Sequence, residues 1–149
     1  MYNQIFLWIR IAGLAMIVGL SACSVEAEKI NYGTDQCAYC SMNIVDKAHS
    51  AQFVTQKGKQ FKFDAVECLV NEIRTVTEED LAIILVADFG SPGTMTEAQD
   101  ASYLISEEIQ SPMGANLSAF HDKQEAAATQ AQYSGQIFSW SELKEQLRP

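Results

Sequence analysis

One order of secondary-structure elements, strand–strand–helix–strand, is predicted twice along this chain, and it constrains the fold more than any other feature. The first set is expected at residues 51–55, 60–63, 65–74 and 81–89. The second set is expected at residues 101–106, 116–120, 122–132 and 136–139. We therefore predict an α+β fold, with one domain (34–149) made of two small ββαβ-like halves packed together, about 34–90 and 91–149. A single α+β domain without an internal repeat is the alternative.

Hydrophobic patterns support the strands. Phe61 and Phe63 flank Lys62, so one face of that strand is expected to be buried. The polar segment 56–59 (QKGK) precedes it and contains a central glycine, which indicates a hairpin. Residues 81–89 (LAIILVADF) form a continuous apolar run of strand length, which predicts a central strand buried on both faces.

Polar residues predict where the helices begin. Asp64 is expected to cap the first helix, with Glu67 three positions later completing a capping box. Asp122 is expected to cap the second helix, which Gly135 ends, and Ser141 to cap a short terminal helix. Each half is therefore expected to turn from a strand into a helix at an acidic residue.

The first 22 residues are predicted to be a lipoprotein signal peptide. The apolar run 11–20 is short for a membrane span, and Leu20-Ser21-Ala22-Cys23 resembles a bacterial lipobox, whose cysteine becomes the lipidated first residue. A plain signal peptide or an anchor helix is the alternative, because Arg10 is the only early charge. We expect Cys23 to carry the lipid and residues 23–33 to form a tether, which places the protein in the cell envelope, lipid-anchored and facing the periplasm.

The charge of the mature chain excludes nucleic acid as a partner. Loss of Arg10 leaves 9 of the 10 Lys and Arg residues against 19 Asp and Glu, a formal charge of −10, and no basic stripe is present. The sequence also contains no recognisable proton-transfer pair, activated nucleophile or phosphate-binding loop. We therefore do not expect an enzyme.

Besides the lipidated residue, the chain contains three cysteines, Cys37, Cys40 and Cys68. An odd number in an exported protein leaves at least one thiol free or bound to a metal. A structural zinc site usually has four ligands, and this chain offers one CxxC motif, with Cys68, His49 and His121 as possible completions. However, the helical pattern around Cys68 favours a small buried core residue, and the polar surroundings of His49 favour exposure to solvent.

The CxxC motif itself allows two further interpretations. A thioredoxin-like redox site should open a helix that follows a strand, and Cys37-Ala38-Tyr39-Cys40 lacks both neighbours. A Cys37–Cys40 disulfide is expected in metal-free protein purified in air, without being the functional state.

A site for a soft metal ion explains the sulfur-containing residues best. Cu(I) prefers thiolate and thioether ligands, and in an extended strand Cys40 and Met42 would point to the same side. Met95 and Met113 lie in or beside turns, where a methionine that fills a core gap is less expected. His121 is a weaker candidate, as a nitrogen ligand beside a helix cap.

Three segments carry a family resemblance. They are Cys37-Ala-Tyr-Cys40-Ser-Met42-Asn-Ile44, then Gly93-Thr-Met95-Thr-Glu-Ala98 with Ala101-Ser-Tyr103, and Ser111-Pro-Met113-Gly-Ala-Asn116-Leu117 with Ala119-Phe120. In this order they resemble the NosL family, lipid-anchored copper chaperones that serve nitrous oxide reductase. The resemblance covers nearly the whole mature chain.

The resemblance implies two ββαβ halves, Cu(I) bound through sulfur, and delivery of copper to nitrous oxide reductase. The ligand candidates are then Cys40, Met42, Met113 and Met95, with Cys37 as a ligand, a redox partner or half of a disulfide. Expected partners are the reductase, the membrane through the lipid anchor, and the membrane transport machinery of the same maturation system. The alternatives are an envelope thiol–disulfide reductase acting through the CxxC motif and a zinc-binding structural lipoprotein.

Overall fold

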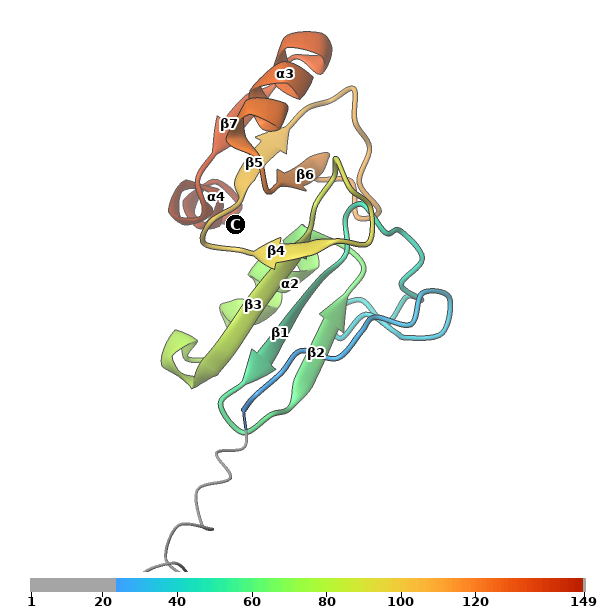
Figure 1. Cartoon of the computed structure of the whole chain (residues 1–149), viewed down its shortest axis with the longest axis vertical. Coiled ribbons are helices and arrows are strands. Elements are labelled where there is room, and N and C mark those ends of the chain that lie inside the picture. The colour runs from blue at the N-terminus through green and yellow to red at the C-terminus, as the bar shows by residue number, and fades with distance from the viewer. Residues whose placement is uncertain (1–23, 149) are drawn as a thin grey trace, which may run out of the picture.

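The computed structural model describes residues 24–148, which form two antiparallel sheets and their helices (Figure 1). The expected signal peptide, 1–22, and Cys23 lie outside the described residues. The first sheet and its helices comprise β1 (Ala51–Thr55), β2 (Gln60–Phe63), α2 (Val66–Ile73), η1 (Glu78–Asp80), β3 (Leu81–Ala87) and β4 (Met95–Glu97). The second comprises β5 (Ser102–Ile105), β6 (Leu117–Phe120), α3 (Lys123–Tyr133), β7 (Gln136–Phe138) and α4 (Trp140–Gln146). The predicted α+β class is confirmed.

Both sheets arrange their first three strands in the same way. The strand order is β2-β1-β3-β4 in the first sheet and β6-β5-β7 in the second. In each sheet the first strand of the sequence is central, and the next two strands pair antiparallel with it on either side. The chain therefore contains the two ββαβ-like halves that the sequence pattern predicts.

Strand β4 belongs to the first sheet, although the sequence predicts a division between the halves near residue 90. The chain turns back at residues 91–94, where the N–H of Thr94 donates to the carbonyl of Ser91. Beyond this turn β4 pairs antiparallel with β3, with Met95 opposite Ala87. The Pro-Gly turn thus closes a hairpin within one sheet instead of separating the two halves.

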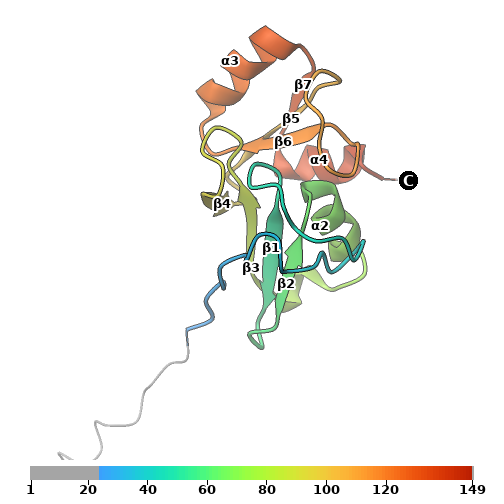
Figure 2. The ribbon, with the colours of Figure 1, turned by 90° about the vertical axis from the view of Figure 1, so that its right-hand side faces the viewer.

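One hydrophobic core joins the first sheet, α2 and part of the second sheet. Its buried side chains include Phe53 and Ile84 of the first sheet, Leu69 of α2 and Leu117 of β6. Helix α2 packs against β1, β2 and β6, so it lies between the two sheets, while α3 lies at the end of the molecule away from the first sheet (Figure 2). Among residues 24–148, no helix is long and apolar enough to cross a membrane.

A buried histidine connects the two halves. His49 is 4% exposed, and its ring nitrogens lie 2.8 Å from Asp46 Oδ2 and 3.2 Å from Ser118 Oγ of β6. A buried imidazole needs such partners, because an unpaired polar group would destabilise the fold. The prediction that His49 is solvated is wrong.

The predicted capping box of α2 is also wrong. The helix is capped at Ala65, without a side-chain hydrogen bond, and the carboxylate of Asp64 accepts the N–H of Val45 instead. Glu67 turns toward the second half, where Oε1 accepts hydrogen bonds from Ser111 Oγ at 2.6 Å and from the N–H of Ala115 at 3.3 Å. Partners distant in sequence have replaced the local cap.

The predicted N-terminal cap is confirmed for α3 and wrong for α4. Asp122 caps α3 as predicted and accepts the N–H of Gln124 at 2.7 Å. Helix α4 is capped by Ser139 rather than Ser141, and Glu142 completes a capping box. The box satisfies two backbone donors at once, which favours the earlier serine.

Candidate metal centre

A tight loop positions the CxxC motif. The flanking residues Gln36 and Asn43 form an antiparallel bridge, and the N–H of Cys37 donates to the carbonyl of Met42 at 2.8 Å. The N–H of Ser41 donates to the carbonyl of Cys37 at 2.9 Å, and Ser41 adopts a positive φ of 62°. Cys40 and Met42 therefore do not lie on one extended strand, because the backbone reverses direction within this segment.

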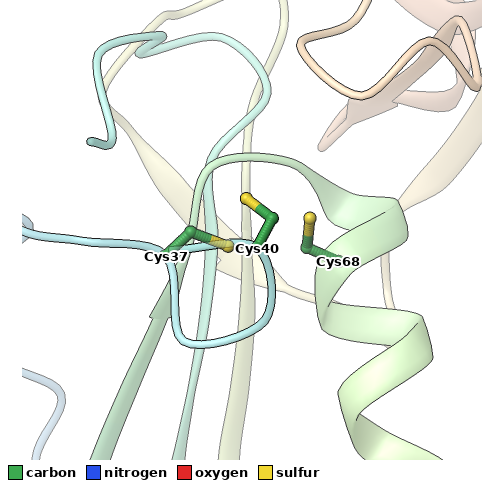
Figure 3. A group of neighbouring side chains, drawn as sticks. All are labelled: Cys37, Cys40 and Cys68. Carbon is green, nitrogen blue, oxygen red and sulfur yellow. The ribbon is translucent and has the colours of Figure 1, made fainter. Parts of the chain in front are cut away.

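Helix α2 brings the third cysteine to this loop. Cys68 lies in the first turn of α2, and its side chain points toward those of Cys37 and Cys40 (Figure 3). The three Sγ atoms all lie within 4.8 Å of one another. Cys37 and Cys68 are buried, with 2% and 1% exposed, whereas Cys40 is partly exposed. The site therefore has two buried thiols and one accessible thiol.

Cys68, which the helical sequence pattern predicts to be a core residue, is the third member of the thiol cluster. It is as buried as a core residue should be, but its sulfur belongs to the thiol cluster. The odd number of cysteines was the signal that could have assigned it, because it required a thiol with a role outside disulfide pairing.

The spacing of the sulfur atoms fits a single soft metal ion. Three sulfurs at about 2.3 Å from one ion, the length of a zinc–thiolate bond, would lie about 4 Å apart in a trigonal arrangement. The observed limit of 4.8 Å requires only small side-chain movements to reach that geometry. Cys68 lies in the first turn of α2, where the positive end of the helix dipole favours negative charge.

The three thiols differ in acidity. The pKa of Cys37 is lowered to about 4, mainly by the hydrogen bond that its sulfur receives from the Cys68 thiol and also by backbone N–H groups, among them those of Cys40 and Asp64. The same bond raises the pKa of Cys68, and burial is the main cause that raises the pKa of Cys40. Cys37 is therefore the most acidic of the three thiols, because a neighbouring thiol and backbone amides stabilise its thiolate form.

We expect reduced, metal-free protein to contain one thiolate at neutral pH. Its ultraviolet thiolate absorbance should develop as the pH rises through about 4, because the ionised form of Cys37 is stabilised. Cys37→Ser should remove this step. A titration in which all thiolate absorbance appears only at alkaline pH would contradict the prediction.

Two of the predicted methionine ligands lie on segments that adjoin the thiols. Met42 follows Cys40 by two positions on the same loop, and its side chain is 44% exposed. Met113, 40% exposed, lines an open cavity of about 340 Å³ together with Cys68 and Tyr39. The loop that carries Met113 is the one held to α2 by Glu67. A thioether from the second half thus borders the same cavity as a thiol from the first half.

Met95 occupies a different place. It lies opposite Ala87 on β4 and lines a cavity with Gln52, Leu85 and the N-terminal segment 27–32. That cavity is lined by no cysteine. The structure therefore does not bring Met95 to the three thiols.

His121 is likewise separate from the cluster. It is exposed at the corner between β6 and α3, and its Nδ1 lies 2.9 Å from Thr96 Oγ1 of β4. Among residues 24–148, no His, Asp or Glu joins the group of three thiols. The site consists of three cysteines, with the Met113 thioether across the adjoining cavity.

Comparison with known proteins agrees with this geometry. A sequence profile of the NosL family matches residues 30–148. Among solved structures, the chain is similar to the crystal structure of the copper chaperone NosL from Shewanella denitrificans, with a TM-score of 0.69 and 19% identity over 80% of this chain and 96% of the other. No curated protein matches the sequence significantly. The profile spans both sheets and all three cysteines, and the chain therefore belongs to the NosL family.

Proposed function

We propose that this protein is a Cu(I) metallochaperone that delivers copper to the copper centres of nitrous oxide reductase. The observation that carries the proposal is the convergence of Cys37, Cys40 and Cys68 at one site in a chain of the NosL family. Thiolates are preferred ligands of Cu(I), and the Met113 thioether beside them has the same preference. Copper is the cargo of the site.

The uneven burial of the thiols suits a carrier. Cys37 and Cys68 lie inside the protein and can exclude water from the ion, whereas Cys40 can be reached from solvent. A receiving protein can then replace one ligand at a time, beginning with Cys40. A closed cage of four buried ligands would hold the ion equally well but would block such exchange.

The same burial argues against a thiol–disulfide reductase. The reactive group of such an enzyme is a thiolate that attacks the client's disulfide. Here the thiol with the lowered pKa is Cys37, whose side chain is 2% exposed, so a client disulfide cannot reach it without opening of the loop. In a copper carrier, by contrast, the buried Cys37 sulfur can bind the ion without contacting a client disulfide.

We expect the reduced protein to retain Cu(I) in direct competition with Zn²⁺. The reason is that zinc sites usually complete four ligands from cysteine, histidine or carboxylate, whereas the accessible fourth group here is a thioether. Metal analysis after competition and X-ray absorption at the copper edge would measure this. Preferential retention of Zn²⁺ would overturn the proposed cargo, and a reductase that fills with copper normally without this protein would overturn the proposed client.

The envelope location is part of the proposal and depends on Cys23, outside the described residues. Replacing Cys23 by serine should release the protein from the membrane fraction without changing its Cu(I) affinity, because the anchor is a lipid on that residue. Cell fractionation measures the first effect and copper titration the second. Retention of the Cys23→Ser protein in membranes would instead favour an uncleaved anchor helix.

A further inference from the structure

The exposed large apolar side chains lie on the two segments that adjoin the thiol cluster, the CxxC loop and the loop that carries Met113. The large hydrophobic residues that are exposed among residues 24–148 are Tyr39 (48%), Met42 (44%), Val45 (64%) and Met113 (40%). The first three follow one another along the CxxC loop, and Met113 shares a cavity with Tyr39 and Cys68. We call these four residues the apolar face. Exposed hydrophobic side chains that collect in one place mark an interaction site more often than scattered ones do.

The loops that form the apolar face carry no charged residues. Segments 36–45 and 109–116 contain no Asp, Glu, Lys or Arg, although these residues make up 19% of the chain. Elsewhere the chain is strongly acidic, with a formal net charge of −9. Depletion of charge, together with exposed aromatic and methionine side chains, is characteristic of the centre of a protein–protein interface.

Position in the chain and a shared cavity connect the apolar face to the thiols. Tyr39 directly precedes Cys40, and Met42 lies two positions after it. Tyr39 and Met113 line one cavity with Cys68, and the N–H of Val45 donates to the carboxylate of Asp64, just before α2. A partner that covers these side chains would therefore lie against Cys40, the accessible thiol.

We propose that the apolar face is the docking surface for the copper-receiving protein, which meets it with an uncharged, apolar patch that presents a thiolate, thioether or imidazole ligand. This inference rests on the proposed function and adds the surface through which transfer occurs. A lipid bilayer fits less well, because it offers no soft ligand for the ion and because anionic headgroups would be repelled by an acidic chain.

The transfer at this surface is a ligand exchange without electron transfer. The incoming sulfur or nitrogen forms a bond to Cu(I) as the bond between Cu(I) and Cys40 breaks, and the ion remains Cu(I) throughout. Where the incoming ligand is a thiol, its proton passes to the released Cys40 thiolate. The bonds to the buried Cys37 and Cys68 break afterwards, as further ligands of the partner enter.

The test compares two variants of the full-length protein in cells that produce nitrous oxide reductase and lack their own copy of this chaperone. The double variant Tyr39→Ser/Val45→Ser removes two apolar side chains that are not metal ligands. Val25→Ser is the matched control, because Val25 is only partly buried and lies beside the β1–β2 hairpin. We expect the double variant to lower the copper content of the purified reductase at least fivefold, with its own Cu(I) affinity within twofold of the wild type. The control should load the reductase normally.

Three other results of these experiments would contradict the apolar face, the protein partner or the proposed client, respectively. Normal copper loading by the double variant would remove the apolar face from transfer. If mature Cys23→Ser protein binds phosphatidylcholine or phosphatidylglycerol vesicles and loses this binding through Tyr39→Ser/Val45→Ser, the face serves lipid and the docking proposal is wrong. If the wild-type protein itself fails to restore copper to the reductase, the proposed client is wrong, and the inference that rests on it falls as well.

Discussion

Replacing Cys68 by serine is expected to weaken Cu(I) binding at least a hundredfold, about 2.8 kcal/mol. The substitution removes one of three sulfurs that lie within 4.8 Å of one another, and a serine hydroxyl is a poor ligand for a soft ion. A change of this size distinguishes a ligand from a core residue, because a purely structural Cys68 would leave the copper affinity untouched. Competition with a chromophoric Cu(I) chelator under reducing conditions measures it.

Stability must be followed in the same variant, because Cys68 is 1% exposed. The serine hydroxyl can keep the hydrogen bond to the Cys37 sulfur, so we expect unfolding to become easier by only about 1–2 kcal/mol. Cys68→Ala is the second variant, because it removes the sulfur without burying a hydroxyl. Normal copper affinity in both folded variants would show that Cys37 and Cys40 suffice, and that Cys68 is a core residue.

Local patterns predicted the strands and helices of this chain well. Phe61 and Phe63 alternate with Lys62 over a short distance, and β2 has the predicted bounds, Gln60–Phe63. Asp122 caps α3 through a donor two positions away. Both features depend on residues that are close together in the chain, so they can be predicted from the sequence.

Features that depend on long-range partners were predicted poorly. Glu67 was expected to complete a local cap, but its carboxylate binds Ser111, 44 positions away. His49 was expected to be solvated, and it is buried by a contact with Ser118, 69 positions away. A polar side chain that joins two halves has the same local surroundings in the sequence as one that faces water, and only the packing of the halves separates the two cases.

The metal site combines both kinds of information. Cys37 and Cys40 were recognised because they lie three positions apart. Cys68 was not, because a buried ligand and a buried core residue produce the same helical pattern. The sequence therefore indicated a sulfur site and its family, but the identity of the third thiol required the packing of α2 against the loop.

Replacing Met113 by leucine is expected to lower Cu(I) affinity at least tenfold, about 1.4 kcal/mol, without unfolding the protein. Leucine nearly preserves the volume and removes the sulfur, so the change in stability should stay below about 1.5 kcal/mol, and partial exposure reduces it further. Met95→Leu is the matched control: the same substitution in a cavity without cysteine should leave copper affinity unchanged. Chelator competition with both variants measures the difference.

The pair of methionine variants also tests how the two halves cooperate. Met113 belongs to the second half, and Glu67 of α2 holds its loop beside Cys68 through Ser111 and Ala115. If Met113→Leu binds copper as the wild type does while Cys40→Ser loses it, the ligands are confined to the first half. If Met95→Leu weakens binding as much as Met113→Leu, the effect belongs to general packing and not to a thioether ligand. A loss restricted to Met113→Leu would mean that the ion is held between the halves, so that a partner could loosen it by moving the 109–116 loop alone.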